Sequence, residues 1–158
     1  DRTSIAHEHV TERVNTVIQY QADYMAQKVN READLIAKID AEVDVEILEN
    51  DLTKIIDELL DNAFKFSEIG AKVTVEAYAD NNKLHIKVSD EGDGMDMKYV
   101  DEIGAYMQFE RVFQEQQGSG LGLVIVKRIT DLYQGTLDIE STLDQGTTLH
   151  VTLHLAEK

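Results

Sequence analysis

Two neighbouring segments in which apolar and polar residues alternate place the strongest constraint on the fold of this chain. Their sequences are KVTVEAYA and KLHIKVSD, and the turn sequence ADNN joins them. An alternation with a period of two is typical of strands that bury one face, and the asparagines favour a tight turn. The pattern therefore predicts a β-hairpin, and a second layer must cover its apolar face.

The other patterns place single helices between pairs of strands. Apolar residues at spacings of three and four predict helices, and short alternating segments predict strands. The predicted elements are a helix over 7–34, strands near 34–40 and 43–47, a helix capped by Asn50 or Asp51 and running through 66, the hairpin, a helix over 121–134 that Gly135 ends, and two closing strands, TLDIES and TTLHVTLHL.

This order of elements predicts a fold class. Strand pairs that alternate with single helices favour a two-layer α/β sandwich, with a mixed, largely antiparallel sheet covered on one face by helices. They argue against a doubly wound parallel sheet, in which strands and helices alternate one by one.

Composition bounds the partners and the compartment. The 158 residues carry a net charge of −16 and include no cysteine. Nucleic acids and anionic membrane surfaces repel a chain this acidic, so we expect neither as a partner. Disulfides and thiolate chemistry are excluded. No apolar run reaches the ~18 residues of a membrane span, and the first residues do not resemble a signal peptide, so we expect a cytoplasmic protein.

A helical wheel over residues 55–66 separates an apolar half from a polar half. Glu58, Asn62 and Lys65 share an arc of roughly 60° within the polar half. Such an arc is either the solvated face of an ordinary amphipathic helix or one side of a metal–phosphate site. In such a site Asn62 gives an oxygen to Mg²⁺, Glu58 orients a water or handles a proton, and Lys65 meets phosphate charge. The helix alone leaves both interpretations open.

The second hairpin strand leads directly into the loop sequence DEGDGMD, which begins at Asp90. The loop is either a turn or a ligand loop in which the backbone comes close to a flat group. As a ligand loop, it would let Asp90 accept a hydrogen bond from the amino group of adenine and repel the carbonyl oxygen of guanine. Asp90 is therefore a candidate for selecting adenine.

Three glycines stand in the sequence GSGLGL, immediately before a long apolar helical pattern. Gly118 and Gly120 would let backbone N–H groups turn toward an anion, and the helix from Leu121 would add the partial positive charge of its start. A flexible loop joined to a helix has the same sequence pattern. The segment is not a Walker A loop, because the Lys-Ser/Thr pair is absent.

These motifs are far more specific together than singly. The segments DELLDNAFKFS, DEGDGMD, FERVF and GSGLGL, in this order and spacing, resemble the N box, the two glycine boxes and the F box of the ATP-binding catalytic domain of sensor histidine kinases. This domain has the Bergerat fold, which it shares with gyrase, Hsp90 and MutL. The stretch IGAYMQFERVFQEQQGSGLGL is most similar to kinases associated with response-regulator receiver domains. The resemblance covers about residues 34–158.

The resemblance implies roles for individual residues. Asn62 matches the Mg²⁺ ligand, Lys65 matches a phosphate-contacting lysine, and Asp90 matches the adenine-binding aspartate. Residues from about 95 to 119 match a flexible ATP lid. The other nucleotide-binding positions that the resemblance implies are Gly92, Gly94, Phe109, Phe113, Gly118, Ser119, Gly120, Leu121, Gly122 and Thr147.

Glu58 departs from the pattern of many histidine kinases, which carry asparagine at this position. Its spacing to Asn62 resembles the gyrase-like ATPases, where the glutamate polarises the attacking water. We therefore expect Glu58, together with Asn62 and Lys65, to act in catalysis. Its expected task is proton handling or a contact with Mg²⁺ through a water.

The resemblance predicts an enzyme that binds Mg²⁺·ATP and transfers the γ-phosphoryl group to a histidine. His7 and His9 lie too close in sequence to Asn62 for a two-helix acceptor hairpin, so we expect the acceptor on a dimerisation domain outside this sequence, with a response-regulator receiver domain downstream. The alternatives are an ATPase of the gyrase or Hsp90 type and a non-catalytic, nucleotide-dependent interaction module. We expect residues 1–33 to be a helical extension packed on the ATP-binding domain, residues 34–158.

Overall fold

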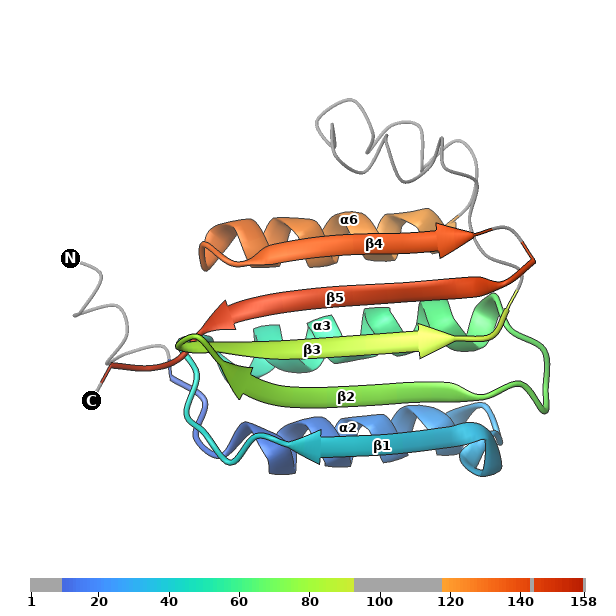
Figure 1. The fold of residues 1–158 in the computed structure, drawn as a ribbon, viewed down its shortest axis with the longest axis horizontal. Helices are drawn as coiled ribbons and strands as arrows, with labels where there is room; N and C mark the ends of the chain where they lie inside the picture. The colour runs from blue at the N-terminus through green and yellow to red at the C-terminus, as the bar shows by residue number, and fades with distance from the viewer. Residues whose placement is uncertain (1–9, 93–117, 143, 158) are drawn as a thin grey trace.

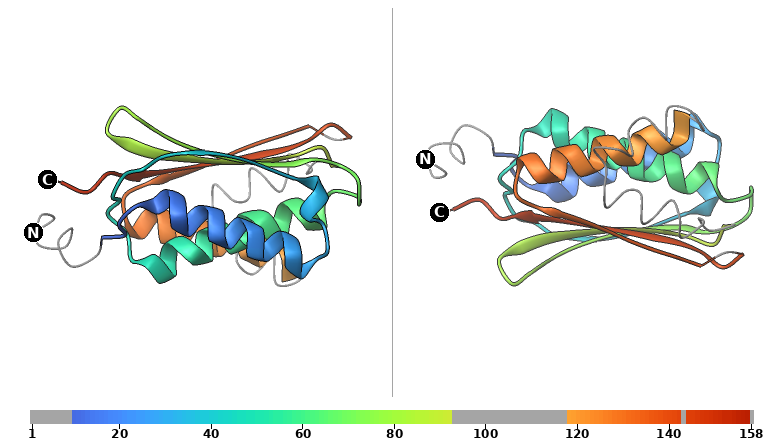
Figure 2. Two further views of the ribbon diagram at one scale, coloured as in Figure 1. Left: turned by 90° about the horizontal axis from the view of Figure 1, so that it is seen from below. Right: turned by 90° about the horizontal axis from the view of Figure 1, so that it is seen from above.

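A computed structural model describes residues 10–92, 118–142 and 144–157 of the chain. Its helices lie together on one face of a single sheet, and the other face of the sheet is open (Figures 1 and 2). The elements in chain order are α2 Val14–Lys28, the 3₁₀ helix η1 Glu32–Asp34, β1 Leu35–Asp40, α3 Glu49–Lys65, β2 Val73–Asp80, β3 Lys83–Asp90, α6 Gly118–Leu132, β4 Thr136–Thr142 and β5 Gly146–His154.

The sheet has five strands in the order β1-β2-β3-β5-β4. The pair β1–β2 is parallel, because the chain crosses from one strand to the other through α3, and the other three pairs are antiparallel. The prediction of a two-layer α/β sandwich with a mixed, largely antiparallel sheet is confirmed.

The predicted hairpin is β2–β3. Asn81 and Asn82 form its two-residue turn and both have positive φ, 53° and 62°, as a type I′ turn requires. Along both strands buried and half-buried residues alternate, so that one face of the hairpin is packed and the other is partly solvated. The turn fixes the register in which Asp90, the last residue of β3, lies opposite Val73.

The first helix is shorter than the predicted range of 7–34. It begins at Val14 and ends at Lys28, and residues 7–9 lie outside the described part of the chain. Asn30 has a φ of 57°, and the N–H of Arg31 returns to the carbonyl of Ala26 at 2.9 Å, which closes the helix. The apolar spacing continues past Lys28, but the left-handed asparagine turns the chain away from the helix axis.

The predicted strand at 34–40 is confirmed as β1, whereas the predicted strand at 43–47 is wrong. Val45 forms only isolated bridges, to Thr11 and to Leu155. Its side chain is fully buried, as is that of Ile47. The apolar residues here are core positions of a connecting segment, and within the described residues no strand extends alongside them to form a ladder.

The start of α3 and the end of α6 also differ from prediction. Leu48 is the N-cap of α3 and uses no side-chain bond, so the predicted caps Asn50 and Asp51 lie inside the helix. Instead, the hydroxyl of Tyr133 donates to Oδ2 of Asp51 at 2.5 Å and accepts from the N–H of Leu48 at 3.3 Å. Tyr133 therefore links the C-terminal end of α6 to the beginning of α3.

Gly135 does not end α6 in the predicted way. The helix ends at Leu132, and the left-handed position is Gln134, with a φ of 60°. The N–H of Gly135 bonds to the carbonyl of Thr130 at 2.7 Å. A Cβ at Gly135 would overlap the carbonyl oxygen of Thr152, so this glycine is needed for close packing on β5.

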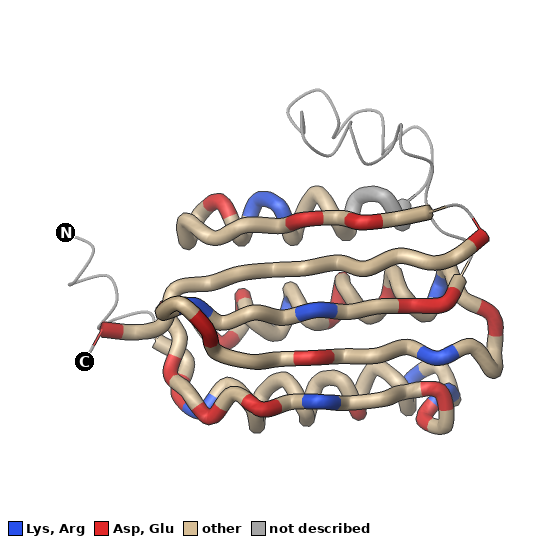
Figure 3. The backbone as a smooth tube through the Cα atoms, viewed as in Figure 1, with Lys and Arg blue, Asp and Glu red and all other residues tan. Residues whose placement is uncertain are grey.

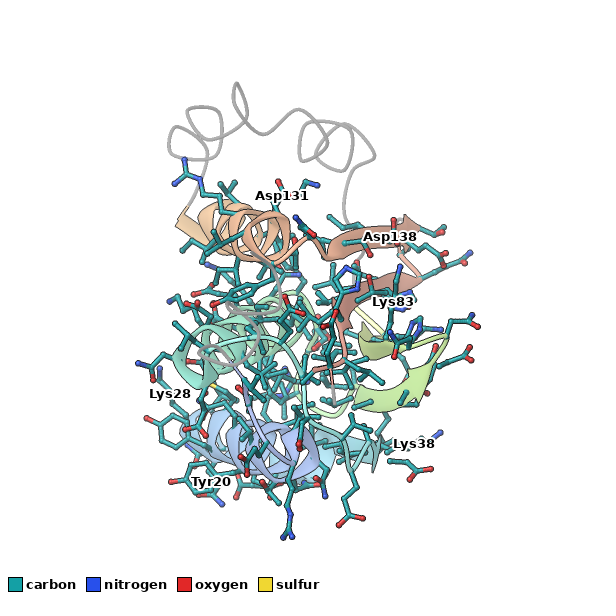
Figure 4. The ribbon with its side chains drawn as sticks, turned by 90° about the vertical axis from the view of Figure 1, so that its left-hand side faces the viewer. Tyr20, Lys28, Lys38, Lys83, Asp131 and Asp138 are labelled. Atoms are coloured by element: carbon teal, nitrogen blue, oxygen red, sulfur yellow. The ribbon has the colours of Figure 1, made fainter. Side chains whose placement is uncertain are left out.

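One hydrophobic core fills the space between the helices and the sheet (Figure 4). The labelled Tyr20 and Lys28 lie on the helix side of that view, and Lys38 and Lys83 lie on the sheet side. The buried residues of α2 belong to the same core as those of α3: Val14, Ile18, Ala22, Met25, Ala26, Leu52, Ile55, Ile56, Leu59, Leu60, Ala63 and Phe64. The boundary at residue 34 stays a prediction. No helix in the described part of the chain is long and apolar enough to cross a membrane.

Candidate functional site

The predicted site elements meet at one end of the molecule. The C-terminal end of α3, the end of β3, the start of α6 and the start of β5 all lie at the right-hand side of Figure 1. Acidic and basic positions are interspersed over both layers (Figure 3). A binding site for an anionic ligand must therefore be built locally from a few side chains and backbone groups.

The three polar residues of α3 are not equivalent in the structure. Lys65 is exposed and Glu58 is half-buried, but only 5% of Asn62 is exposed. The Nδ2 atom of Asn62 is buried and has no hydrogen-bond partner among the described residues. A buried amide nitrogen without a partner is costly, so it marks a place where a ligand or a water would complete the site.

Glu58 is fixed between two neighbours. Lys54, one turn earlier in α3, contacts Oε1 of Glu58 at 2.8 Å, and this bond raises the pKa of Lys54. On the other side α6 passes so close that a Cβ at Gly122 would overlap Oε2 of Glu58. The carboxylate of Glu58 therefore lies in the contact between α3 and α6.

Gly118, Ser119 and Gly120 lie inside α6, although the sequence places them in a loop before a helix that begins at Leu121. A glycine costs a helix about 1 kcal/mol relative to alanine, so propensity alone argues against this extension. At Gly122, further along α6, the glycine has a packing reason, because the missing Cβ lets α6 approach Glu58. The side chains of residues 118–121 are not described.

Asp90 ends β3 and is buried, with 6% of its surface exposed. Its Oδ1 accepts the N–H of Gly92 at 2.9 Å. Gly92 in turn lies against the chain that follows α3, since a Cβ at Gly92 would overlap the carbonyl oxygen of Phe66. The carboxylate of Asp90, the backbone of Gly92 and the end of α3 thus form one contact.

Thr147 lies opposite Asp90 in the β3–β5 pair. It is 3% exposed, and its hydroxyl shares a 2.8 Å hydrogen bond with that of Ser141 on β4. Gly146, just before it, has a φ of 116°, and a Cβ there would overlap the carbonyl oxygen of Asp90. The predicted nucleotide contact of Thr147 stays a prediction.

The family model for histidine kinase-, DNA gyrase B- and HSP90-like ATPases matches residues 47–157. The chain belongs to this ATPase family. The match includes α3, β3, α6 and β5, the four elements that meet at the site. The predicted resemblance to the ATP-binding domain of histidine kinases is confirmed.

Individual relatives agree with the family. The histidine protein kinase SaeS of Staphylococcus aureus (strain USA300) is 35% identical over 112 residues, which are 65% of this chain and 30% of that protein. The chain therefore spans less than a third of the curated relatives that it matches. The structure of the mycobacterial sensor histidine kinase MprB superposes with a TM-score of 0.75 at 25% identity, covering 95% of this chain and 99% of that one. The catalytic domain of the histidine kinase ThkA superposes with a TM-score of 0.75 at 20% identity, and the alignment covers 92% of this chain and 95% of that one. This similarity supports the fold.

The structure brings part of the predicted site of this ATPase domain together. Asn62 and Lys65 lie in the last turn of α3, Gly92 lies against the residue that follows this turn, and Asp90 accepts the N–H of Gly92. Gly94, Phe109, Phe113 and most of the predicted lid lie outside the described residues. The ligand roles of all these residues stay predictions.

Sequence patterns did not reveal the backbone carbonyl of Phe66 or the buried side chain of Arg31. A backbone oxygen has no residue-type signature. Arg31 is 5% exposed, although it stands just after a helix, where an arginine is usually solvated. Only its unusual burial singles it out, and burial is a property of the folded chain.

Proposed function

We propose that this chain binds Mg²⁺·ATP and transfers the γ-phosphoryl group to a histidine of a dimerisation domain outside this sequence. The observation that carries the proposal is the buried amide of Asn62, whose Nδ2 has no partner in the described part of the chain, at the same end of an ATPase fold as the carboxylate of Asp90. The relative SaeS is a histidine protein kinase, and this favours phosphotransfer over hydrolysis alone or docking without chemistry.

The geometry around Asp90 suits adenine. A carboxylate has two oxygens and can accept several hydrogen bonds, so Asp90 can hold the N–H of Gly92 and still accept from an exocyclic amino group. A Cβ at Gly92 would overlap the carbonyl oxygen of Phe66, so the glycine lets the backbone beside Asp90 pack closely against the end of α3. Guanine presents a carbonyl oxygen where adenine has its amino group, and the carboxylate would repel it.

The residues of α3 fit a magnesium–phosphate group. Among the described residues no three His, Cys, Asp or Glu side chains form a metal cluster, so an all-protein cage for a metal is not available there. Mg²⁺ commonly takes one or two protein oxygens and completes its shell with phosphates and waters, and when bound it neutralises phosphate charge. Oδ1 of Asn62 would be such a ligand, and Nδ2 would donate to a phosphate oxygen or a bound water.

The side chains of the protein contribute to phosphoryl transfer by positioning the phosphates and by supplying charge. Lys65 is exposed at the end of α3, where its ammonium group can reach phosphate oxygens. Glu58, held by Lys54 and Gly122, would accept a proton or orient a water beside the phosphates. Phosphoryl transfer needs little covalent help from the enzyme, so a few fixed polar groups suffice.

The proposal names two protein partners and a compartment. The acceptor histidine belongs to a helical dimerisation domain, and a response-regulator receiver domain takes the phosphoryl group afterwards. The ATP that this domain would use comes from the cytoplasm, so the proposal places the domain in the cytoplasm.

A calorimetric titration with a non-hydrolysable ATP analogue tests the binding step. We expect saturable binding that is stronger with Mg²⁺ than without, weak binding of the GTP analogue, and loss of binding in Asp90→Ala. Asp80→Ala is the matched control, since Asp80 is an exposed aspartate at the opposite end of the same sheet. Binding that is equal for the two nucleotides, or unaffected by Asp90→Ala, would contradict the assigned site. Transfer of labelled phosphate to the histidine-bearing domain then tests the reaction.

A further inference from the structure

Arg31 is buried between α2 and the end of α3, far in sequence from every predicted site residue. It follows the left-handed Asn30, and its own backbone N–H closes the end of α2. Its side chain is only 4% exposed. An arginine is almost never this buried unless its charge and its five N–H donors are matched by acceptors.

All five donors of the guanidinium group are used. Nε donates to Oδ2 of Asp34 at 2.8 Å. The other four bonds go to backbone carbonyls of one segment, residues 64–71, which begins in the last turn of α3 and leads to β2. These acceptors are the carbonyls of Phe64 at 2.9 Å, Ser67 at 3.0 Å, Glu68 at 2.7 Å and Ala71 at 3.2 Å.

Asp34 completes the cluster. Its Oδ2 also accepts the N–H of Gly70 at 3.0 Å. The Arg31–Asp34 ion pair therefore binds carbonyl groups and one N–H group of the 64–71 segment. The guanidinium carbon lies 5.0 Å from the centre of the Phe64 ring, in a cation–π contact. The positive charge also lies near the C-terminal end of α3, where the helix dipole favours a cation.

The 64–71 segment lies between the two halves of the proposed nucleotide site. Of the residues proposed for Mg²⁺ and phosphate, Asn62 lies in α3 just before the segment, and Lys65 lies at the start of the segment. Phe66, between two of the carbonyls that Arg31 binds, places its own carbonyl against Gly92. Gly92 in turn donates to Asp90, the residue proposed for adenine.

We propose that Arg31, fixed by Asp34, is a positioning residue for nucleotide binding. It sets the distance between the triphosphate half and the adenine half of the site, although it touches neither. The inference rests on the proposed function. It predicts that loss of the guanidinium fork harms ligands that span both halves more than ligands that occupy one half.

The test compares an ATP analogue with adenosine in Arg31→Lys. Lysine keeps the positive charge and part of the packing but donates at most three hydrogen bonds from one point, so it cannot hold four carbonyls in a plane. We expect the dissociation constant of the non-hydrolysable ATP analogue to rise about tenfold, and that of adenosine to change by about threefold or less. Asp34→Ala, which leaves Arg31 in place, should show the same selective loss to a smaller degree.

Tyr133→Phe is the matched control. It removes a hydroxyl that links two elements at the opposite end of α3, and it should leave both dissociation constants unchanged. Thermal unfolding of each variant reports the fraction that is folded during the titrations. If Arg31→Lys does not fold, the dissociation constants of the ATP analogue and of adenosine are compared in Asp34→Ala, and a selective loss of the ATP analogue there tests the positioning role.

The possible outcomes separate the inference from the function on which it rests. A wild-type protein that binds neither ligand overturns both. A wild-type protein that binds both, with an Arg31→Lys variant that binds the ATP analogue equally well, overturns the positioning role alone. Equal losses for the two ligands also overturn it, because a simply destabilised protein would bind every ligand more weakly by the same factor. Selective loss of the ATP analogue supports it.

Discussion

Gly122 and Glu58 offer a direct test of how α3 and α6 fit together. In Gly122→Ala the new methyl group would overlap Oε2 of Glu58 and lie 3.3 Å from its Cδ. The carboxylate cannot swing away freely, because Lys54 holds its other oxygen at 2.8 Å and the group is only 17% exposed. The substitution therefore forces either a new rotamer of Glu58 or a shift of α6.

Two opposing effects set the magnitude. Alanine in place of a helical glycine stabilises by about 1 kcal/mol, whereas overpacking at a closed contact costs about 1–3 kcal/mol. In the wild-type background we expect Gly122→Ala to be neutral or to destabilise by up to about 2 kcal/mol. In the Glu58→Ala background the overlap is gone, so the same substitution should stabilise by about 1 kcal/mol.

Urea unfolding of the four proteins in this double-mutant cycle gives the coupling energy, which should be about 1–3 kcal/mol. Asp61→Ala with Gly122→Ala is the matched control cycle, since Asp61 is an exposed acidic residue on the same helix. That cycle should be additive within about 0.5 kcal/mol. If Gly122→Ala has the same effect with and without Glu58, the close approach of the two helices is not the reason for the glycine.

Three further predictions concern stability. Leu59→Ala, at a fully buried position of α3, should lower the free energy of unfolding by about 2–5 kcal/mol in urea titrations. Burial lowers the pKa of His150 in the folded state, so the unfolded chain binds protons more readily and stability should fall as the pH drops below about 6.5. His150→Gln should flatten this dependence in thermal unfolding measured across that range, and an unchanged profile would assign it to another group. Burial and the hydrogen bond to Asp51 raise the pKa of Tyr133 to about 12, so the unfolded chain releases the proton first. Stability should therefore fall as the pH rises above about 10. Tyr133→Phe should remove that alkaline loss, at a cost of about 1 kcal/mol at neutral pH, as measured by denaturant titration at both pH values.

The sequence predicts the β2–β3 hairpin of this fold more accurately than it predicts where the helices begin and end. Strands β2 and β3 are predicted well, because a period of two and the two asparagines of the turn are local signals. The sequence does not predict the end of α2, because the apolar spacing continues while the left-handed Asn30 stops the helix. The prediction of a strand at Val45 is wrong because a buried bridge and a short strand select the same residue types.

In the candidate site, too, local sequence patterns predict some features, whereas others depend on how the chain packs. The position of Asp90 at the end of a strand follows from the alternation that precedes it. The wheel gives the direction of Asn62 but not its burial, because burial depends on what is packed around α3 and not on the helix alone. The contacts of Arg31 with the 64–71 segment cross more than 30 positions of sequence to backbone carbonyls, which every residue possesses, so no pattern of residue types can indicate them.

Gly92 and Gly122 are better explained by close contacts than by flexibility. Gly122 touches the carboxylate of Glu58, and Gly92 touches the carbonyl of Phe66 and the carboxylate of Asp90. Each glycine thus lies against a group that the proposed function uses. A methyl group at either position would displace a different part of the site: at Gly122 the proton-handling carboxylate, and at Gly92 the adenine-binding one. Alanine substitutions at the two positions should therefore give different defects, in turnover for Gly122 and in nucleotide affinity for Gly92, whereas a general need for flexibility would affect both quantities at both positions.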